Sequence, residues 1–345
     1  MSFSFRNHQY LQIGRLVEMA ILVMGGLKPR DMRNNSLRDM LKNNQSIVRI
    51  YDGLKEFYYR YCISDETFIK KRFKKNLGRD VDLNNPVKYN DKLQWLKLNW
   101  YDPMAVKCAD KYEVRQFVKD RIGSEYLNEI FAVYDSVDEI NLEQLPTAFV
   151  LKGTHGSGFN VICKDKTRVD WNKEFNKMNR WLRTNYYWES REWVYKDIKP
   201  RIVCEKLLLD EDGTVPKDYK FFCFDGEPQF MFIASDRGRD TKFDFYDLDW
   251  NKLPVKQYYP TSDYNIQKPK NLNKILELSR KLSKGFPHVR VDFYLCGNDV
   301  IFGELTFFHF SGTKMFVPEK YDEIFGRYID LSRIENKKRK IEAFL

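Results

Sequence analysis

The sequence predicts a chain of mixed class, α+β or α/β, whose strands pair as antiparallel hairpins. Short apolar runs bounded by glycine, proline and asparagine turns follow one another from residue 149 to residue 308, as expected of strands. Segments with helical periodicity separate some of these runs, and a longer helical pattern precedes them all. The alternation favours two-layer packing of helices on sheets.

The individual elements follow in order along the chain. In DKYEVRQFVKDRIGS, apolar residues recur at spacings of three and four from Val114 to Ile122, and Gly123 closes the helix. A second helix is expected from Phe175 to Arg183 and a third from Leu272 to Lys284. The expected strands are FVLK, NVICK, RIVCEKLLL, DYKFFCF, PQFMFIAS and two more within residues 288–308.

The chain is long enough for two or three lobes that share one body. It has 345 residues, 43% of them hydrophobic and 16% aromatic, with a mean hydropathy of -0.61. A basic helical N-terminal region extends over residues 1–85 and ends at the turn-rich stretch DLNNP. We expect the main body over residues 86–331 and a basic helix or tail over residues 332–345.

Positive charge is concentrated at the N-terminal end. Residues 1–80 hold 16 lysines and arginines against 8 acidic residues, an excess of 8 within the net charge of +10. Residues 1–85 could therefore contact an anionic lipid surface or an anionic polymer, or simply form a solvated helical face. Nucleic acid is the least favoured partner, because no RNA- or DNA-binding signature accompanies the charge.

Cysteine usage and hydropathy indicate a reduced compartment. The six cysteines are scattered, with no C-x-x-C pair, which argues against zinc and disulfides. The apolar stretch at residues 17–26 is interrupted by Glu18 and falls well short of the ~20 residues of a membrane span. We expect a cytoplasmic protein whose N-terminal region can contact the inner face of the cytoplasmic membrane.

A glycine-rich loop follows the first predicted strand, in FVLKGTHGSG at residues 149–158. It fits neither the Walker form G-x-x-x-x-G-K-[ST] nor the dinucleotide form G-x-G-x-x-G. Its glycines would nevertheless let backbone amides approach an anion, and Thr154, His155 and Ser157 would add donors. The pattern fits a loop that covers a phosphate, and it equally fits a tight hairpin with Lys152 directed to solvent.

Residues 288–308, HVRVDFYLCGNDVIFGELTFF, are typical of a hairpin of two alternating strands. If residues 297–299 form its loop, Cys296 pairs with Val300. The strand register follows from this choice, and a shift of one residue would move every side chain to the other face.

In that register, Asp292 falls opposite Glu304 and Arg290 falls opposite Thr306. Two facing carboxylates repel unless a cation lies between them, and their hard oxygen atoms favour Mg²⁺. Arg290 would then meet a phosphate oxygen. The alternative is a surface face with an ordinary arginine–aspartate salt bridge.

These motifs occur in the order used by the ATP-grasp superfamily. The segments YNDKLQWLKL, DKYEVR, FVLKGTHGSG, IKPRIVCEKLL, DYKFFCFDGEP, FYDLDWNKLP, LSKGFPHVRVDFY and FGELTFF together resemble the TupA-like ATP-grasp family. That family is associated with bacterial cell-surface polysaccharide synthesis and is named for teichuronopeptide. The resemblance covers residues 86–330 and implies an α+β ATP-grasp fold with a helical basic N-terminal extension.

The resemblance also implies roles for individual residues. Lys111 and Lys152 would bind the ATP phosphates, and a loop of Gly153, His155, Gly156, Ser157 and Gly158 would close over them. Glu205, Lys206 and Leu207 would form the hinge segment that binds adenine, and Asp218 or Lys220 would meet the ribose and phosphates. Asp292 and Glu304 would hold Mg²⁺ beside Arg290, which would bind a phosphate. One departure is Thr306, which stands where many superfamily members carry an asparagine or an acid.

The implied reaction is ATP-dependent joining of a carboxylate to an amine through an acyl phosphate. Its partners would be an amino acid and a sugar or polysaccharide precursor. Candidate acceptor contacts are Asp236, Arg237, Arg239, Thr306 and His309. Two other interpretations stay open: a glycosyltransferase that uses the D-x-D motif at residues 247–249, and a non-catalytic scaffold that binds an anionic polymer or membrane.

Overall fold

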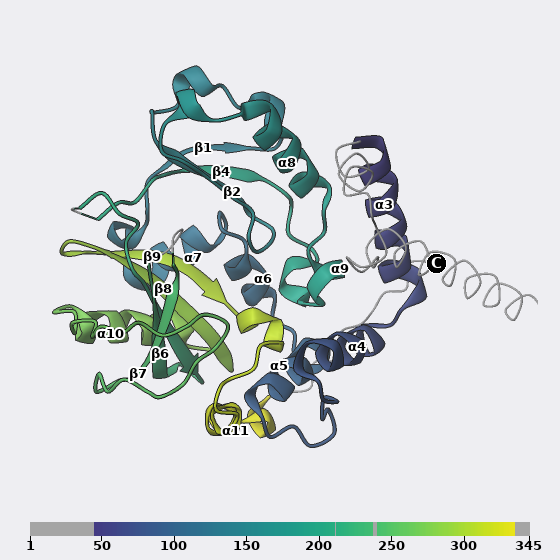
Figure 1. The fold of residues 1–345 in the computed structure, drawn as a ribbon, viewed down its shortest axis with the longest axis vertical. Helices are drawn as coiled ribbons and strands as arrows, with labels where there is room; N and C mark the ends of the chain where they lie inside the picture. The colour runs from purple at the N-terminus through teal and green to yellow at the C-terminus, as the bar shows by residue number, and fades with distance from the viewer. Residues whose placement is uncertain (1–44, 211, 237–239, 335–345) are drawn as a thin grey trace, which may run out of the picture. The chain divides into compact units, whose positions relative to one another are not determined.

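The computed structural model describes residues 45–210, 212–236 and 240–334 (Figure 1). By its internal contacts the chain divides into two units, residues 1–71 and 72–345. The boundary expected near residue 85 therefore differs from this division. The difference has a physical reason, because Arg79 is bonded to Asp91 and so belongs with the second unit.

The described part of the first unit is helical, as its sequence predicts. Helix α3, Gln45–Phe57, continues into a turn of π-helix at Tyr58–Cys62. Helix α4, Asp65–Leu77, follows and spans the division between the units. Within the described residues, we find no helix long and apolar enough to span a bilayer.

The second unit begins with helices α5, Tyr89–Asn99; α6, Pro103–Ala109; and α7, Val114–Ile122. Asp102 starts α6 by accepting the backbone N–H of Met104 at 2.8 Å, and Pro103 tolerates the first helical position. Gly123 ends α7 with φ +110°, as the sequence predicts.

The first sheet contains β1, Ile130–Tyr134; β2, Phe149–Gly153; β3, Asn160–Cys163; and β4, Ile202–Lys206, in the order β1-β4-β2-β3. Every pairing is antiparallel. Helix α8, Trp171–Arg183, lies beside this sheet (Figure 1). Phe149 and Leu151, on one face of the sheet, pack in one core cluster with residues of α8. Because side chains alternate along a strand, Val150 and Lys152 point to the opposite face.

The second sheet contains β5, Asp218–Phe224; β6, Glu227–Ser235; β7, Lys242–Asp247; β8, His288–Cys296; and β9, Asp299–Thr306, in the order β7-β6-β5-β8-β9. Helix α10, Leu272–Ser283, packs against β5, β6 and β8, and helix α11, Lys320–Gly326, packs against α5. The α+β class with antiparallel sheets is confirmed.

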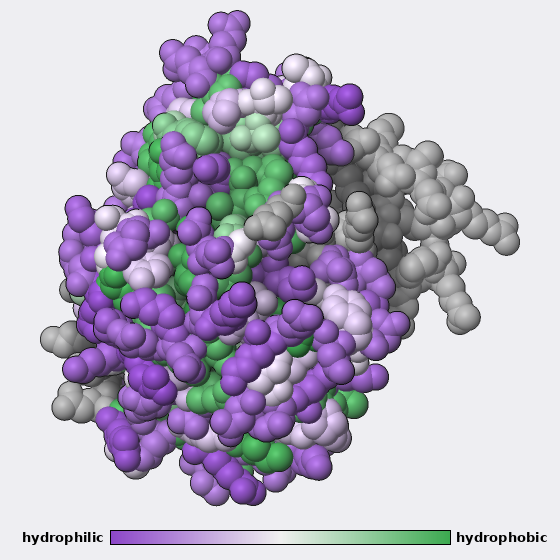
Figure 2. Space-filling view, turned by 90° about the vertical axis from the view of Figure 1, so that its left-hand side faces the viewer, coloured by the Kyte–Doolittle hydropathy of each residue, from purple (hydrophilic) through white to green (hydrophobic). Residues whose placement is uncertain are grey.

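Short helical turns connect these elements. They are α9, Tyr187–Ser190, and 3₁₀ turns at Ser124–Tyr126, Val137–Glu139, Leu142–Gln144, Lys166–Arg168, Trp193–Tyr195, His309–Gly312 and Leu331–Arg333. Viewed from the left of Figure 1, the surface is mostly hydrophilic, and hydrophobic side chains gather in its upper half (Figure 2).

The β8–β9 hairpin has a shorter loop than predicted, but Asp292 and Glu304 pair as predicted. Cys296 pairs with Asp299, so the turn has two residues and the expected three-residue loop is wrong. A β-bulge at Gly303 then adds one residue to β9, which again places Asp292 opposite Glu304. A side chain at residue 303 would come within 3.1 Å of the Asp292 carbonyl oxygen, so the bulge favours glycine.

We predict that Gly326→Ala destabilises the second unit. The added Cβ would lie 2.2 Å from the Val87 carbonyl oxygen and 2.7 Å from the Tyr89 amide nitrogen, where α11 meets α5. Overpacking of this kind costs about 1–3 kcal/mol, which urea unfolding would show as a lower midpoint. The matched control is Gly53→Ala, whose Cβ meets no atom within 4 Å. Equal midpoints for the two variants would contradict the prediction.

Candidate active site

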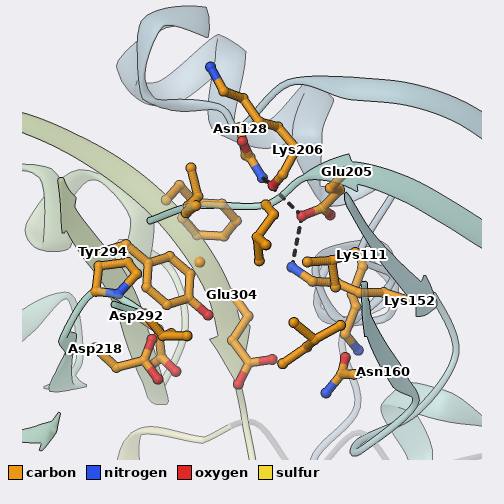
Figure 3. Close-up of a pocket in the computed structure, with 18 of the residues that line it drawn as sticks. Lys111, Asn128, Lys152, Asn160, Glu205, Lys206, Asp218, Asp292, Tyr294 and Glu304 are labelled. Atoms are coloured by element: carbon orange, nitrogen blue, oxygen red, sulfur yellow. Dashed lines mark hydrogen bonds and ion pairs between the residues drawn. The ribbon is translucent and has the colours of Figure 1, made fainter. Parts of the chain in front are cut away.

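A pocket of about 320 Å³ lies between the two sheets of the second unit (Figure 3). In the close-up, Lys111, Lys152 and Glu205 lie on one side and Asp218 and Asp292 on the other, with Glu304 between them. An apolar group of side chains completes the lining: Val150, Ile162, Leu207, Leu208, Val215, Pro216 and Phe302. The pocket therefore combines an apolar slot with a charged floor, as small-molecule sites commonly do.

The wall from the first sheet presents Lys152 and Glu205 on neighbouring antiparallel strands. The Lys152 Nζ lies 2.7 Å from Glu205 Oε2. Asn128 donates from Nδ2 to the same Glu205 oxygen at 3.3 Å and to the Lys206 carbonyl at 2.9 Å. Lys152 is therefore not directed to solvent, and Glu205 holds it at the pocket wall.

Lys111 reaches the pocket from the turn between α6 and α7. Asp110 shapes this turn by accepting the backbone N–H groups of Tyr112 at 2.8 Å and Glu113 at 3.2 Å. The Lys111 amine donates to the Gly156 carbonyl at 2.6 Å. Burial lowers the pKa of Lys111, and the charge of Lys152 adds to this effect. Two ammonium groups thus converge on the pocket, which favours an anionic ligand.

The glycine-rich loop only partly lines the pocket. A Cβ on Gly153 or Gly156 would come within 2.9 Å or 2.7 Å of the Phe159 side chain, so these glycines make room for that ring. Ser157 and Gly158 do line the pocket, and Gly158 adopts φ +78°. Of the loop residues that we predicted to bind phosphate, these two are the ones placed at the cavity.

His155 does not face the pocket, contrary to the predicted role. Its side chain is buried, its Nε2 lies 2.8 Å from the Trp181 carbonyl oxygen, and its ring contacts Phe159. Burial lowers the pKa of its imidazole. His155 therefore anchors the loop to α8 instead of offering a donor to a ligand.

The wall from the second sheet carries a buried ionic cluster. Lys220 lies with its Nζ 2.5 Å from Asp292 Oδ2 and 3.3 Å from Asp218 Oδ2. Arg290 donates from Nε and Nη2 to the two oxygens of Asp292, each at 2.7 Å. This bidentate geometry is the strongest form of arginine–carboxylate pairing.

Glu304 is the most accessible carboxylate of the cluster, with 42% of its side chain exposed. Its Oε1 accepts from Arg290 Nη2 and from Thr306 Oγ1, each at 3.0 Å. Burial of the carboxyl opposes ionisation, but the charges of Arg290, Lys220 and Lys111 prevail and lower the pKa of Glu304 to about 2. Glu304 therefore stays ionised at neutral pH.

The acidic side chains fit Mg²⁺ by chemistry and charge. Glu304 is ionised, and its Oε2 makes no hydrogen bond within the described residues. Asp292 accepts three hydrogen bonds and keeps a lone pair for a further contact. The described residues contain no group of three or more His, Cys, Asp or Glu side chains that could hold a metal ion by itself. Mg²⁺ commonly uses one or two carboxylates together with substrate phosphates, which suits this pair.

The predicted acceptor contacts are not all brought together. Thr306 belongs to the cluster, whereas His309 is fully buried and contacts Arg290 with its Nδ1 2.6 Å from Nη1. Asp236 is exposed and accepts the Tyr264 hydroxyl at 2.8 Å. Arg237 and Arg239 lie outside the described residues.

The D-x-D motif closes a turn after β7. Asp247 accepts the backbone N–H of Asn251 at 2.7 Å and its side-chain amide at 2.8 Å. Neither Asp247 nor Asp249 lines the pocket. The motif thus fits a turn, which weakens the glycosyltransferase interpretation.

Several pocket residues were missed by the motif analysis. They include Asn128, Val150, Asn160, Ile162, Val215, Pro216, Tyr294 and Phe302. Strand alternation could have found some of them, because Val150 shares a face with Lys152 and Tyr294 shares a face with Asp292. Loop residues such as Asn128 and Pro216 carry no comparable periodic signal.

Comparison with known protein families shows to which family the chain belongs. The model of the family described as TupA-like ATPgrasp matches residues 91–330. The chain belongs to the TupA-like ATP-grasp family. The resemblance predicted from the motifs over residues 86–330 is therefore confirmed.

Comparison with solved structures gives more distant similarities. A D-alanine–D-alanine ligase from Bacillus anthracis complexed with ATP is 14% identical with a TM-score of 0.39, over 71% of this chain and 82% of that one. The ADP complex of PurK, N5-carboxyaminoimidazole ribonucleotide synthetase, is 11% identical with a TM-score of 0.40, over 71% and 57%. The ATP-grasp ligase PsnB with its minimal precursor is 10% identical with a TM-score of 0.35, over 82% and 68%. No curated protein matches. The family assignment rests on the family model alone.

We predict that Arg290→Met destabilises the second unit strongly. The substitution would leave the buried Asp292 carboxylate with only Lys220, and breaking a buried ion pair costs about 3–5 kcal/mol. The free energy of unfolding in urea measures the loss. The matched control is Arg280→Met, because Arg280 pairs with Glu227 at the surface, where ion pairs contribute about 1 kcal/mol or less. A loss for Arg290→Met as small as that for the control would refute the cluster's structural role.

Proposed function

We propose that this ATP-grasp protein is an ATP- and Mg²⁺-dependent ligase that joins a carboxylate to an amine and forms ADP. One observation carries the proposal. The pocket places the two ammonium groups of Lys111 and Lys152 across from the ionised Glu304 and its partner Asp292. That arrangement suits a nucleoside triphosphate whose phosphates meet lysines on one wall and metal-binding carboxylates on the other.

The nucleotide would lie along the pocket from the apolar slot to the charged floor. Leu207, Val215 and Phe302 would contact the purine, and the backbone of Lys206 would run beside its edge. Asp218 and Lys220 also line the pocket and would contact the ribose or a phosphate. Ser157 and Gly158 would cover the phosphates from the loop.

Glu304 and Asp292 would hold Mg²⁺ in the proposed site. The bound ion would neutralise charge that develops on the transferred phosphoryl group. The protein's own residues would do the rest of the work. Lys111 and Lys152 would orient the phosphates, and Arg290 would present a fixed guanidinium to a phosphate oxygen.

The proposed reaction has two transfers. A carboxylate oxygen of the acceptor attacks the γ-phosphorus, and ADP departs with the electron pair of the broken P–O bond. An amine nitrogen then attacks the acyl carbon, phosphate departs, and the nitrogen loses a proton to give the amide. Charge stabilisation and positioning account for most of such catalysis, so the proposed reaction needs no side-chain nucleophile.

For the substrates, we propose an amino acid and a cell-surface sugar or polysaccharide precursor. The support is the association of the TupA-like family with polysaccharide synthesis. Thr306, Asp236, Arg237 and Arg239 are the proposed acceptor contacts. We further propose that the reaction takes place in the cytoplasm and that residues 1–85 contact the membrane surface.

We predict that the chain binds Mg-ATP and does not bind UDP- or GDP-sugars in calorimetric titrations. Lys152→Ala and Glu304→Gln should each raise the Kd for Mg-ATP about tenfold or more, because each removes a charged contact of about 1.5–3 kcal/mol. The control is Lys281→Ala, which changes an exposed lysine paired with Glu277. Binding of a nucleotide sugar instead, or indifference to both substitutions, would overturn the assignment.

We predict that hydroxylamine traps an acyl phosphate. In a screen over amino acids and uronic acids, the true carboxylate substrate should yield a hydroxamate together with equimolar ADP. EDTA should abolish both products, because the phosphoryl transfer depends on the divalent cation. ADP release with no hydroxamate for any carboxylate would point to another acceptor and contradict the ligase chemistry.

A further inference from the structure

Helix α5 carries a stripe of buried polar side chains on one face. Asn90, Gln94 and Lys97 recur at spacings of four and three and are only 1%, 1% and 6% exposed. Polar groups are buried at a cost unless they are hydrogen-bonded, and these three bind the backbone of residues 311–314. The contacts are Gln94 Nε2 to the carbonyls of Ser311 at 2.9 Å and Gly312 at 2.8 Å, Lys97 Nζ to the Ser311 carbonyl at 2.9 Å and Oγ at 2.7 Å, and Asn90 Nδ2 to the Lys314 carbonyl at 3.1 Å.

The segment that α5 holds has an unusual backbone. Phe310, Ser311 and Gly312 are all left-handed, with φ of 47°, 57° and 59°. Each non-glycine residue in this region costs about 1–3 kcal/mol and persists only where its surroundings enforce it. A Cβ on Gly312 would come within 2.4 Å of Gln94 Nε2, so the helix also leaves no room for a larger residue. The surrounding contacts therefore hold the backbone of this turn in a conformation that is unfavourable by itself.

His309 begins this turn and directs its ring into the ionic cluster. Its Nδ1 lies 2.6 Å from Arg290 Nη1, and its Nε2 lies 2.8 Å from Gln257 Oε1. Gln257 donates from Nε2 to the Lys314 carbonyl at 3.1 Å, which fixes the orientation of its amide. A guanidinium can only donate, so Nδ1 accepts and the proton of the imidazole sits on Nε2. Burial and the charge of Arg290 lower the pKa of His309 well below its usual value, in agreement with a neutral ring.

Within the described residues, the contacts of Arg290 use four of its five N–H groups. A guanidinium has five N–H groups. Those on Nε and Nη2 contact Asp292, Glu304 and Thr306, and His309 takes one of the two on Nη1. Within the described residues, the second Nη1 hydrogen has no partner. A neutral acceptor anchors Nη1 without adding negative charge to a cluster that already holds three carboxylates.

We propose that His309 and Gln257 are positioning residues that fix Arg290 so that its remaining Nη1 hydrogen meets an anionic oxygen of the γ-phosphate of the bound nucleotide. The polar stripe of α5 holds the turn from which His309 projects. Neither residue touches the substrate itself. The nature of the anion rests on the proposed function, whereas the tautomer of His309 does not.

The first test is the imidazole ¹⁵N spectrum of the full chain at neutral pH. The chain has only four histidines, so His309 can be assigned by its loss in a substituted protein. We expect His309 to be protonated on Nε2 alone. His288 is the internal control with the opposite tautomer, because its Nδ1 donates to the Cys223 carbonyl at 3.1 Å while its Nε2 faces the Tyr89 hydroxyl at 2.9 Å. A charged His309, or one protonated on Nδ1, would overturn the proposal.

The second test compares His309→Asn with His309→Leu. The Asn Oδ1 stands at the same number of bonds from Cβ as Nδ1 and can accept from Arg290, whereas leucine fills the space without an acceptor. We expect His309→Leu to raise the Kd for Mg-ATP about tenfold relative to Mg-ADP, by loss of an oriented charge-assisted contact, and His309→Asn to restore the ratio. A purely structural role would weaken both nucleotides equally in both variants.

The two tests separate this inference from the proposed function. If the unsubstituted protein binds neither nucleotide, the proposed function and the identity of the anion both fail, while the tautomer still decides whether the His309–Arg290 contact exists. If nucleotides bind but His309→Leu leaves the ATP-to-ADP ratio unchanged, the positioning role fails and the ligase proposal stands.

Discussion

The candidate site depends on one buried guanidinium, that of Arg290. It bonds to Asp292 on its own strand, to Glu304 and Thr306 on β9, and to His309 in the turn that follows. Carboxylates taken out of water need such a partner, because uncompensated burial of a charge costs several kcal/mol. The register of β8 and β9 therefore sets the charge pattern of the pocket. A slip of β9 by one residue would move Glu304 and Thr306 to the opposite face of the sheet, away from Arg290 and Asp292.

The β8–β9 hairpin shows which structural features can be predicted from the sequence and which cannot. Alternation of polar and apolar residues correctly put Asp292 opposite Glu304 on one face. The turn was predicted one residue too long, and the bulge at Gly303 was not foreseen; the two errors cancel. Gly297 and Asn298 suit a two-residue turn, so the hairpin was open to the correct reading. The bulge at Gly303 could not be predicted in this way. A lone glycine within a strand indicates either a bulge or the close approach of another backbone or a ligand, and sequence spacing does not distinguish the two.

The glycine loop and helix α5 show a different limit. Three loop glycines suggested an anion site, yet Gly153 and Gly156 accommodate Phe159, and His155 is bonded to the Trp181 carbonyl. The family motifs led to the charged residues that do line the pocket. Nothing local marked Gln94 or Lys97, whose shared partner Ser311 lies more than 200 residues away. A polar residue on a helix face is usually solvated. Its burial becomes visible only once the fold brings the carbonyl groups of residues 311–314 against it.

The charge balance of the pocket has a consequence for how a nucleotide could bind. Four cationic side chains line it, Lys111, Lys152, Lys206 and Lys220, and four anionic ones, Glu205, Asp218, Asp292 and Glu304. Two of these cations are already committed, since Lys152 is paired with Glu205 and Lys220 with Asp292. A nucleoside triphosphate carries several negative charges and would meet the carboxylates as well as the lysines. The side chains of the pocket alone would therefore bind it weakly. Divalent cations that bridge phosphate and carboxylate turn those same acids from repulsive neighbours into ligands. On this argument, metal ions held by these carboxylates would contribute to nucleotide affinity itself, and the ionised Glu304 would be their first ligand.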